Sequence, residues 1–391
     1  MLNFTFNIPT KIIFGKDEHK NIGQYIKPYA SKILLHYGGG SIKRSGVYDE
    51  IVASLNEAGI EFAELGGVVP NPRVKLVRKG IELCREEGVE LILAVGGGSV
   101  IDSAKAIAIG MLYDGDVWKL YREKIITKKA MPVATVLTIP AAGSEMSDSS
   151  VISNEEEQLK CGHRDHATRP VLSVVNPALF MTLPKEQIGN GAADIMSHIF
   201  ERYFTQTKNT DVSDELCEGV LRVVIKNAPK LIADQNNYDA WCELAWASSL
   251  AHNDLLGRGR EEDWACHHIE HELSAIYDVV HGAGLAVLTP NWMEIVHKAN
   301  VPMFLQFARN VMGVADGRDS DEIIFQAINR LRRFFRDLGL PGTLTELGIG
   351  PERLGEMAKK CTGIAFGEEI GEGNFVRFGW QGVLRILEAA L

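Results

Sequence analysis

Histidines and one aspartate recur in this sequence at spacings suited to holding a metal ion. Asp194 and His198 are four residues apart, so on a helix they lie on one face and can bind the same ion. His267 and His271 repeat this spacing, and His281 lies a short way downstream. An Asp/His set of this kind suits Fe²⁺ or Zn²⁺. A lone helical histidine is more often a surface or core residue, and that alternative stays open for each pair taken alone.

Two neighbours of these histidines have suitable chemistry but an unsuitable position. His268 faces away from the helix face that His267 and His271 share, so we expect it to be structural or solvated. Cys266 has a thiol that can bind metals, but its neighbour already faces the site. We therefore expect Cys266 to pack in the core.

A glycine-rich loop forms the second chemical feature of the sequence. Gly96, Gly97, Gly98 and Ser99 stand between the apolar run Leu91–Val95 and an expected helix. Glycines let the backbone approach a phosphate closely, and the free N–H groups at a helix start bind anions. Ser99 is expected to cap this helix, with Asp102 in a capping-box-like place three residues on. The loop departs from the GxGxxG fingerprint, so a tight turn without a ligand is the alternative.

A second glycine loop suggests which dinucleotide is bound. Gly38, Gly39, Gly40 and Ser41 follow the strand-like run 33–37, where nucleotide folds often carry an acidic residue for the adenosine ribose. This loop has no carboxylate and is followed by two cations, Lys43 and Arg44. A 2′-phosphate fits such a loop, which favours NADP as the cofactor and leaves NAD as the alternative. Lys43 and Arg44 can also be ordinary solvated charges.

The elements that must position these residues differ between the two halves of the chain. Up to about residue 180, short apolar runs alternate with helical patterns, which predicts a parallel sheet covered on both faces. The expected strands are Ile33–Tyr37, Ile60–Leu65, Leu91–Val95, Met131–Ile139 and Val171–Val175. Helical spacing dominates afterwards, at Lys185–Phe204, Ser213–Asn227, Tyr238–Leu256, Asp263–Ala275 and Asp321–Leu338. We expect an α/β domain over residues 1–180 and an all-α domain over 181–391.

Composition limits the partners and the compartment. The 391 residues carry 41 Lys+Arg against 51 Asp+Glu, a formal charge of 41 − 51 = −10, which argues against nucleic acid as the main partner. No apolar stretch approaches the ~20 residues that span a bilayer, and the N-terminus does not read as a secretory signal. The six cysteines are far apart, so reduced thiols are expected. These features predict a cytoplasmic protein without a membrane segment.

Together these motifs resemble the iron-containing (group III) alcohol dehydrogenase family nearly from end to end. The resemblance rests on Ile13-Phe14-Gly15, Pro70-Asn71-Pro72, the segment 96–105, Gly143-Ser144-Glu145, Asp194-x-x-x-His198, His267-x-x-x-His271 and His281-Gly282. The loop at 37–41 and the length are most similar to the branch of NADPH-dependent aldehyde reductases and butanol dehydrogenases. The resemblance implies a Rossmann-like domain followed by a helical domain, the architecture of dehydroquinate synthase.

The resemblance also implies roles for individual residues. Asp194, His198, His267 and His281 would bind Fe²⁺ or Zn²⁺, and His271 would be an unliganded histidine that relays a proton beside the substrate. The expected cofactor-binding residues, from the two loops and the family motifs together, are Gly38, Gly39, Gly40, Ser41, Gly96, Gly97, Gly98, Ser99, Asp102, Thr138, Ser144 and Lys160. The implied activity is hydride transfer between NAD(P)H and small aldehydes or primary alcohols, in a homodimer.

Three positions depart from the family pattern. Ala142 stands where a hydroxyl residue usually precedes Gly-Ser-Glu, which would remove one hydrogen bond to the cofactor. Asn176 replaces the aspartate of the usual Asp-Pro. Asp148 adds a carboxylate that would either repel a phosphate or bind another polar group.

Two other enzyme classes share part of this pattern. A lyase of the dehydroquinate-synthase type uses a similar fold, NAD and a divalent metal, but needs several basic residues around a phosphorylated substrate. The segment 161–166 offers some of these, whereas the helical half offers few. A metal-dependent hydrolase would not need the two glycine loops. Net consumption of NADPH with an aldehyde separates a dehydrogenase from a lyase, because the lyase regenerates its cofactor.

Overall fold

The computed structural model describes residues 1–367 and 369–391, and the chain divides into two compact units. One unit comprises Asn7–Leu183, and the other comprises Pro184–Leu391 together with Met1–Phe6. The sequence placed the first six residues with the α/β half. They group instead with the helical unit, where the amino group of Met1 donates to the carbonyl of Lys208 (2.8 Å) and the Leu2 N–H donates to Gly259 (2.7 Å).

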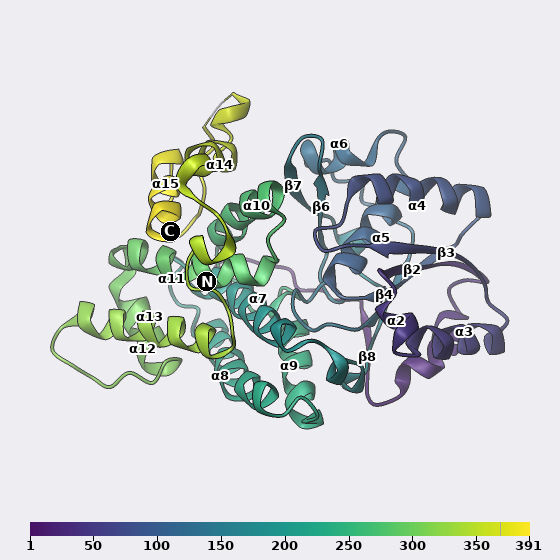
Figure 1. The fold of residues 1–391 in the computed structure, drawn as a ribbon, viewed down its shortest axis with the longest axis horizontal. Helices are drawn as coiled ribbons and strands as arrows, with labels where there is room; N and C mark the ends of the chain where they lie inside the picture. The colour runs from purple at the N-terminus through teal and green to yellow at the C-terminus, as the bar shows by residue number, and fades with distance from the viewer. Residues whose placement is uncertain (368) are drawn as a thin grey trace. The chain divides into compact units, whose positions relative to one another are not determined.

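The unit 7–183 is built on a six-stranded parallel sheet with the strand order β1-β8-β5-β4-β2-β3 (Figure 1). Its strands are β1 (Lys11–Phe14), β2 (Lys32–Gly38), β3 (Glu61–Val68), β4 (Leu91–Gly96), β5 (Val133–Leu137) and β8 (Leu172–Val175). Every residue of β4 and β5 is buried, as continuous apolar strands between two helical layers require. The predicted parallel α/β architecture is confirmed.

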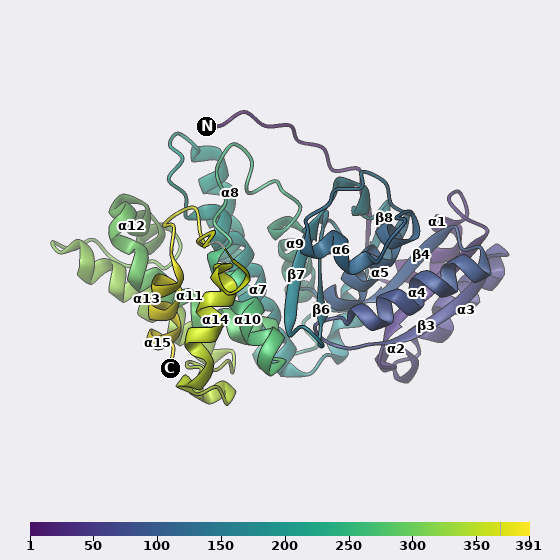
Figure 2. The same cartoon turned by 90° about the horizontal axis from the view of Figure 1, so that it is seen from above.

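Helices on both faces bury these strands. The main ones are α3 (Val47–Ala58), α4 (Val74–Glu87) and α5 (Gly98–Met111), with shorter helices α1 (Ile22–Ile26), α2 (Ser41–Arg44) and α6 (Val117–Arg122). Ile51 and Leu55 of α3 pack with Leu35 and Leu93 of the sheet in one fully buried cluster. Figure 1 shows α4 and α5 on one side of the sheet and α3 on the other, and in Figure 2 α4 lies in front of the sheet.

The strand order brings the two glycine loops to one place. From β2 the chain continues to β3 on one side, whereas from β4 it continues to β5 on the opposite side. The adjacent parallel strands β2 and β4 run in register up to Tyr37 and Val95, so loops 38–40 and 96–98 leave the same sheet edge side by side. This is a topological switch point, where open α/β sheets bind their ligands.

An antiparallel hairpin, β6 (Ser149–Asn154) and β7 (Leu159–Arg164), was not predicted from the sequence. Its strands alternate between polar and apolar residues over only a few positions, and the pattern does not separate them from a loop. The hairpin packs on α5, the helix that follows the loop at 96–98.

The other unit is helical. It contains α7 (Lys185–Tyr203), α8 (Asp211–Ala233), α9 (Tyr238–Ala251), α10 (Ala265–Tyr277), α11 (His281–Val296), α12 (Val301–Asn310), α13 (Ser320–Asp337), α14 (Leu354–Cys361) and α15 (Trp380–Ala389). No β-strand forms within 184–367 or 369–391, where Glu372 and Phe378 make an isolated bridge. None of the described helices has the length and apolar character needed to cross a membrane.

Helix α7 is the centre of this unit. It contacts α8, α9, α10 and α11. Ile188, Gly189 and every residue of the helix from Gly191 onward are buried. Such a helix must be apolar on all sides, and the polar residues that it does carry are therefore exceptional. Asp194, His198 and Glu201 are all buried within it.

His36 is a buried histidine of β2, the strand that leads into the loop at 38–40. It is fully buried in β2, with Nδ1 2.8 Å from the Leu65 carbonyl of β3 and Nε2 2.9 Å from the Ser103 hydroxyl of α5. Burial lowers the pKa of His36 to about 4, against the smaller opposing effect of the Leu65 carbonyl. The imidazole is therefore neutral in the folded protein at neutral pH.

We predict that protonation of His36 contributes to acid unfolding. Its pKa is lower in the folded than in the unfolded chain, so its stabilising effect is complete above pH 6.5 and is lost as the pH falls toward 4. The difference corresponds to about 3 kcal/mol. Urea unfolding of metal-free protein at pH 7 and pH 4.5 should show a smaller loss of stability for His36→Gln than for wild type. Equal losses in both proteins would contradict this assignment.

Candidate metal centre and cofactor loops

The structure places the three expected histidine ligands around one carboxylate oxygen of the fourth, Asp194. Oδ1 of Asp194 lies 3.3 Å from Nε2 of His198, one turn further along α7. It lies 3.9 Å from Nε2 of His267 in α10 and 4.0 Å from Nε2 of His281, the first residue of α11. One ligand atom each from Asp194, His267 and His281 lie within 4.8 Å of one another.

Two of these atoms are buried without a hydrogen-bond partner among the described residues. They are Oδ1 of Asp194 and Nε2 of His267. A buried polar atom without a partner is costly, and most such atoms are satisfied by protein, water or an ion. A divalent cation that accepts a lone pair from each of these atoms would remove that cost, so the residues present fit a metal ion.

Two further carboxylates hold the outer sides of the imidazoles. Nδ1 of His267 donates to Glu201 of α7, and the same carboxylate accepts the backbone N–H of His267 at 3.0 Å. Nδ1 of His281 likewise donates to Glu270 of α10. With the proton held on Nδ1, the lone pair on Nε2 is available, which is the usual arrangement of metal-ligating histidines.

The charges of this cluster favour a cation. Burial by itself would lower the pKa of His267, but the carboxylates of Glu201 and Asp194 outweigh it and raise the pKa to about 9. The pKa of His198 is lowered well below its usual value, first by burial and then by the neighbouring His252 and His267. The centre therefore attracts positive charge, while His198 stays in the neutral form that binds metals.

His271 lies beside this centre, partly exposed, with its ring centroid 5.9 Å from that of His281. Its ligand atoms also group with those of Glu270 and His281. Glu270, however, already accepts hydrogen bonds from His281 and from the Ser274 hydroxyl. The set around Asp194 is therefore the better candidate for a metal, and His271 is left beside it.

His268 and Cys266 lie outside the candidate metal ligands. Nδ1 of the exposed His268 is 2.7 Å from the Glu372 carboxylate. Cys266 is buried, and burial raises the pKa of its thiol well above the usual value, so a thiolate ligand is disfavoured. Sequence reasoning missed Glu201 and Glu270. Glu201 lies two helical turns after Asp194, a spacing that could have identified it.

The loop at 96–98 begins α5, but the capping differs from the prediction. The helix begins at Gly98 with Gly97 as the N-cap residue in an extended conformation, so Ser99 lies inside the first turn rather than at the cap. Asp102 does not cap the helix either. It accepts the Ser144 hydroxyl (2.6 Å) and the Val151 N–H (2.9 Å), and thereby joins α5 to two later segments.

A buried lysine completes this connection. Nζ of Lys105 lies 2.7–3.2 Å from five oxygen atoms of Ser144, Ser147 and Ser149. Burial lowers the pKa of Lys105 to about 8 and raises the pKa of Asp102, and Lys105 and Lys160 oppose that rise. Thr138 donates its N–H to the Gly96 carbonyl (3.0 Å). The expected cofactor residues Thr138 and Ser144 are thus joined to the loop at 96–98 and to α5.

The loop at 38–41 differs from the prediction in its charge. The sequence shows no carboxylate there, but the neighbouring strand β3 supplies Glu64. Its carboxylate accepts the Tyr37 hydroxyl (2.9 Å) and lies 3.5 Å from Nζ of Lys43, which also lies over the Tyr37 and Tyr48 rings. Lys43 is therefore partly neutralised. Gly40 has φ +101°, and an added Cβ at Gly39 would meet no atom within 4 Å, so this loop is open to a ligand.

The three departures from the family pattern have local explanations. Asp148 lies 2.9–3.0 Å from nitrogens of Arg164, His166 and Arg169, so its charge is compensated inside the unit. The Asn176 side chain accepts the Ala178 N–H (3.0 Å) as a helix cap. Ala142 lies against the first loop, 3.2 Å from where a Cβ on Gly98 would be.

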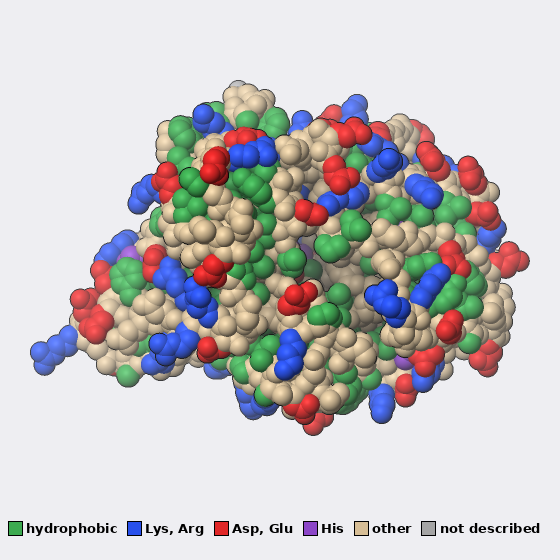
Figure 3. Space-filling view, in the orientation of Figure 1, with side chains coloured by type: hydrophobic (Ala, Val, Ile, Leu, Met, Phe, Trp, Pro, Cys, Tyr) green, Lys and Arg blue, Asp and Glu red, His purple; other side chains and the backbone are tan. Residues whose placement is uncertain are grey.

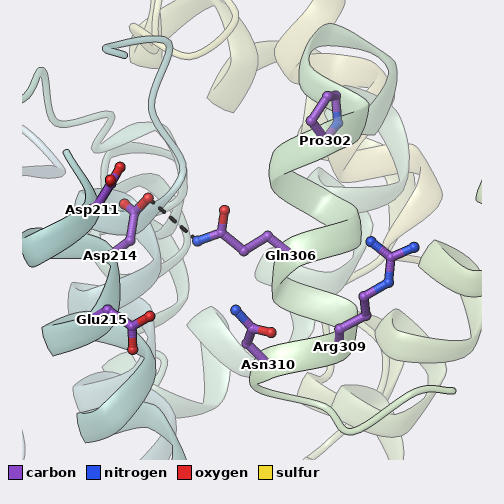
Figure 4. A pocket seen from close by; sticks show the side chains of 7 residues that line it. All are labelled: Asp211, Asp214, Glu215, Pro302, Gln306, Arg309 and Asn310. Carbon is purple, nitrogen blue, oxygen red and sulfur yellow. Dashed lines mark hydrogen bonds between the residues drawn. The ribbon is translucent and has the colours of Figure 1, made fainter. Parts of the chain in front are cut away.

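A separate hollow of about 510 Å³ opens between α8 and α12 (Figure 4). It is lined by Asp211, Asp214, Glu215, Pro302, Gln306, Arg309 and Asn310. Gln306 bridges Asp214 (3.4 Å) and Glu218 (2.7 Å) across it. None of the expected site residues lines this hollow. On the face drawn in Figure 3, cationic and anionic side chains are interspersed.

Comparison with known proteins identifies the family. The model of the iron-containing alcohol dehydrogenases matches residues 9–177, and that of the C-terminal region of the same family matches residues 190–391. The chain belongs to the iron-containing alcohol dehydrogenase family. It is therefore an oxidoreductase of the alcohol dehydrogenase class, and the lyase alternative is wrong.

The relatives of this chain differ in the dinucleotide that their names give. NADH-dependent butanol dehydrogenase A of Clostridium acetobutylicum is 48% identical over 92% of this chain and 93% of its own. NADPH-dependent aldehyde reductase YqhD of Escherichia coli is 35% identical over the same shares. The crystal structure of NADH-dependent butanol dehydrogenase A from Thermotoga maritima matches with a TM-score of 0.96 at 40% identity, covering 100% of this chain and 99% of that one.

We predict that the Glu201→Gln variant binds metal more weakly. Gln keeps the size of the side chain but removes the charge that holds the proton on Nδ1 of His267. Loss of such an outer partner weakens metal affinity on the order of 10- to 100-fold. Titration of metal-free protein with Co²⁺ measures the effect. Glu215→Gln, an exposed charge change on α8, is the control, and equal affinities in both variants would show that Glu201 has no such role.

Proposed function

We propose that this protein interconverts small aldehydes and primary alcohols with NAD(P)H, in the manner of a butanol dehydrogenase. The observation that carries the proposal is the pair of unsatisfied buried atoms, Oδ1 of Asp194 and Nε2 of His267, among the imidazoles of a chain from this family. In this proposal Asp194, His198, His267 and His281 hold one divalent metal ion, with Fe²⁺ as the first candidate and Zn²⁺ as the alternative.

When bound, such a metal supplies Lewis acidity toward the substrate oxygen, and the nicotinamide supplies or accepts the hydride. The protein's own contribution is orientation. Glu201 and Glu270 fix the rings of His267 and His281 through Nδ1. The buried position of Asp194 keeps bulk water from its carboxylate, which strengthens its interaction with positive charge.

His271 is the proposed proton relay. Alcohol oxidation releases a proton, and aldehyde reduction takes one up, so a group between the centre and solvent is needed. The His271 ring is partly exposed and lies next to the His281 ring, 5.9 Å between centroids. Histidine titrates near neutral pH and suits such a transfer.

We propose NADPH as the reductant, with NADH as the alternative. The pyrophosphate would lie at the start of α5, which begins at Gly98 directly after the N-cap residue Gly97, because a helix N-terminus attracts anions. Ser41 and Arg44, whose guanidinium lies near Gly40, would hold a 2′-phosphate. The contact of Lys43 with Glu64 weakens this preference, and the relatives include enzymes of both kinds.

We also propose a cytoplasmic homodimer. Met1, Leu2, Phe4 and Phe6 are apolar and exposed along an extended N-terminal segment, which a second copy of the chain would cover. The six cysteines are free thiols in the structure, and a reducing compartment would keep them so.

The decisive experiment is an aldehyde panel on protein of known metal content, assayed with NADPH and with NADH. We expect net oxidation of the nucleotide in proportion to aldehyde reduced, and faster turnover with NADPH. Asp194→Asn should lose both the metal and most of the activity. Absence of net nucleotide consumption with every aldehyde would refute the proposed function, and equal turnover with both nucleotides would refute the preference.

For the relay, we predict that His271→Ala lowers kcat on the order of 100-fold while the metal content is retained. His268→Ala, on the exposed face of the same helix, should leave kcat unchanged. The metal content and the kcat of both variants are measured by metal analysis and steady-state kinetics. If His271→Ala loses the metal instead, His271 is a ligand and the proposed ligand set is incorrect.

A further inference from the structure

One of the three candidate imidazole ligands lacks the support that the other two have. His267 and His281 are each held by a carboxylate at Nδ1. Nδ1 of His198 is buried and, within the described part of the chain, has no hydrogen-bond partner. Metal-ligating histidines almost always donate their second nitrogen to such a partner. Something else must therefore fix the ring of His198.

Other rings surround His198. The imidazole of His252, the residue after α9, lies 4.1 Å from it between centroids with the planes tilted by 34°. The indole of Trp264 lies 5.8 Å away at 69°, edge to face. The same indole is 5.3 Å from the His267 ring and 5.7 Å from the His252 ring. The four rings thus pack as one cluster in which His198 has little room to rotate.

Trp264 is held in this cluster at a cost to its backbone. It is the N-cap residue of α10 and has φ 76° and ψ 2°, the left-handed conformation. For a bulky residue this conformation is a clear outlier, and such outliers persist where the surroundings enforce them, often at functional sites. Glycine would adopt it freely. The position has tryptophan instead, which indicates that the indole itself is needed.

Contacts on the far side of the indole fix its orientation. Nε1 donates to the Glu262 carboxylate at 3.0 Å. The guanidinium carbon of Arg202, from α7, lies 4.6 Å from the centre of the ring, a cation–π distance. The indole is therefore anchored from α7 and from the segment before α10, and it transmits that anchoring to the imidazoles.

We propose that Trp264, together with His252, positions the ring of His198 for metal binding, in place of the carboxylate that the other two histidines have. Both are positioning residues, because they act through His198. A ring fixed before the metal arrives loses less conformational freedom on binding. This inference rests on the ligand set of the proposed function.

The test compares variants that keep a flat ring with variants that remove it. In metal-free protein, Trp264→Gly and His252→Ala should each bind Co²⁺ about tenfold more weakly, with altered ligand-field absorption bands. Trp264→Phe and His252→Phe should retain most of the affinity and the wild-type spectrum. The spectrum reports ligand geometry directly, which a general loss of stability does not change.

Two controls separate the possible causes. Asn209→Gly relaxes another left-handed residue, φ 60°, at an exposed site and should leave Co²⁺ binding unchanged. Asp194→Asn should abolish tight binding, which tests the ligand set independently. If Trp264→Gly does not fold, the test uses His252→Ala, His252→Phe and Trp264→Phe instead.

The outcomes are distinguishable. Wild-type affinity and spectrum in Trp264→Gly and His252→Ala, with binding lost in Asp194→Asn, would overturn the positioning role and leave the proposed function intact. Wild-type binding in Asp194→Asn would overturn the ligand set and the inference with it. Weaker binding and shifted bands only in the variants without a ring would support the inference.

Discussion

The helical unit is organised around a buried charge that requires a partner. Asp194 lies in a largely buried helix, and the elements that carry the three imidazoles converge on its carboxylate. Glu201 and Glu270 add negative charge behind the rings. A buried set of this composition is stable only when positive charge compensates it. The packing of α7, α10 and α11 therefore creates the same buried negative site that a cation would occupy.

In the α/β unit the central strands are buried, but the sheet edge where the two glycine loops leave stays uncovered. Its strand order separates the chain after β2 from the chain after β4, so neither following segment covers the edge between them. Lys105 and Asp102 then tie α5 to the segment 144–151, which holds the start of that helix in a defined place. Rigidity around an open edge is what a dinucleotide site requires.

Local patterns in the sequence predicted much of this, and contacts between distant segments explain what they missed. The four-residue spacing of Asp194 and His198 and the alternation of strands with helices depend only on neighbours along the chain, and both helix and sheet follow from them. Glu64 reaches the loop at 38–41 only through the pairing of β3 with β2. Likewise, the ring cluster of His252 and Trp264 depends on how α7, α9 and α10 pack, which no spacing in one segment encodes.

The compensated carboxylate at position 148 has a consequence for how this sequence can change over evolutionary time. Arg169 is almost completely buried beside Asp148, with Arg164 and His166 on the same carboxylate. Replacing the aspartate alone would leave a buried guanidinium facing two other basic groups. Replacing Arg169 alone would leave the two more exposed basic side chains to balance a buried acid. The two positions are thus expected to mutate together rather than one at a time.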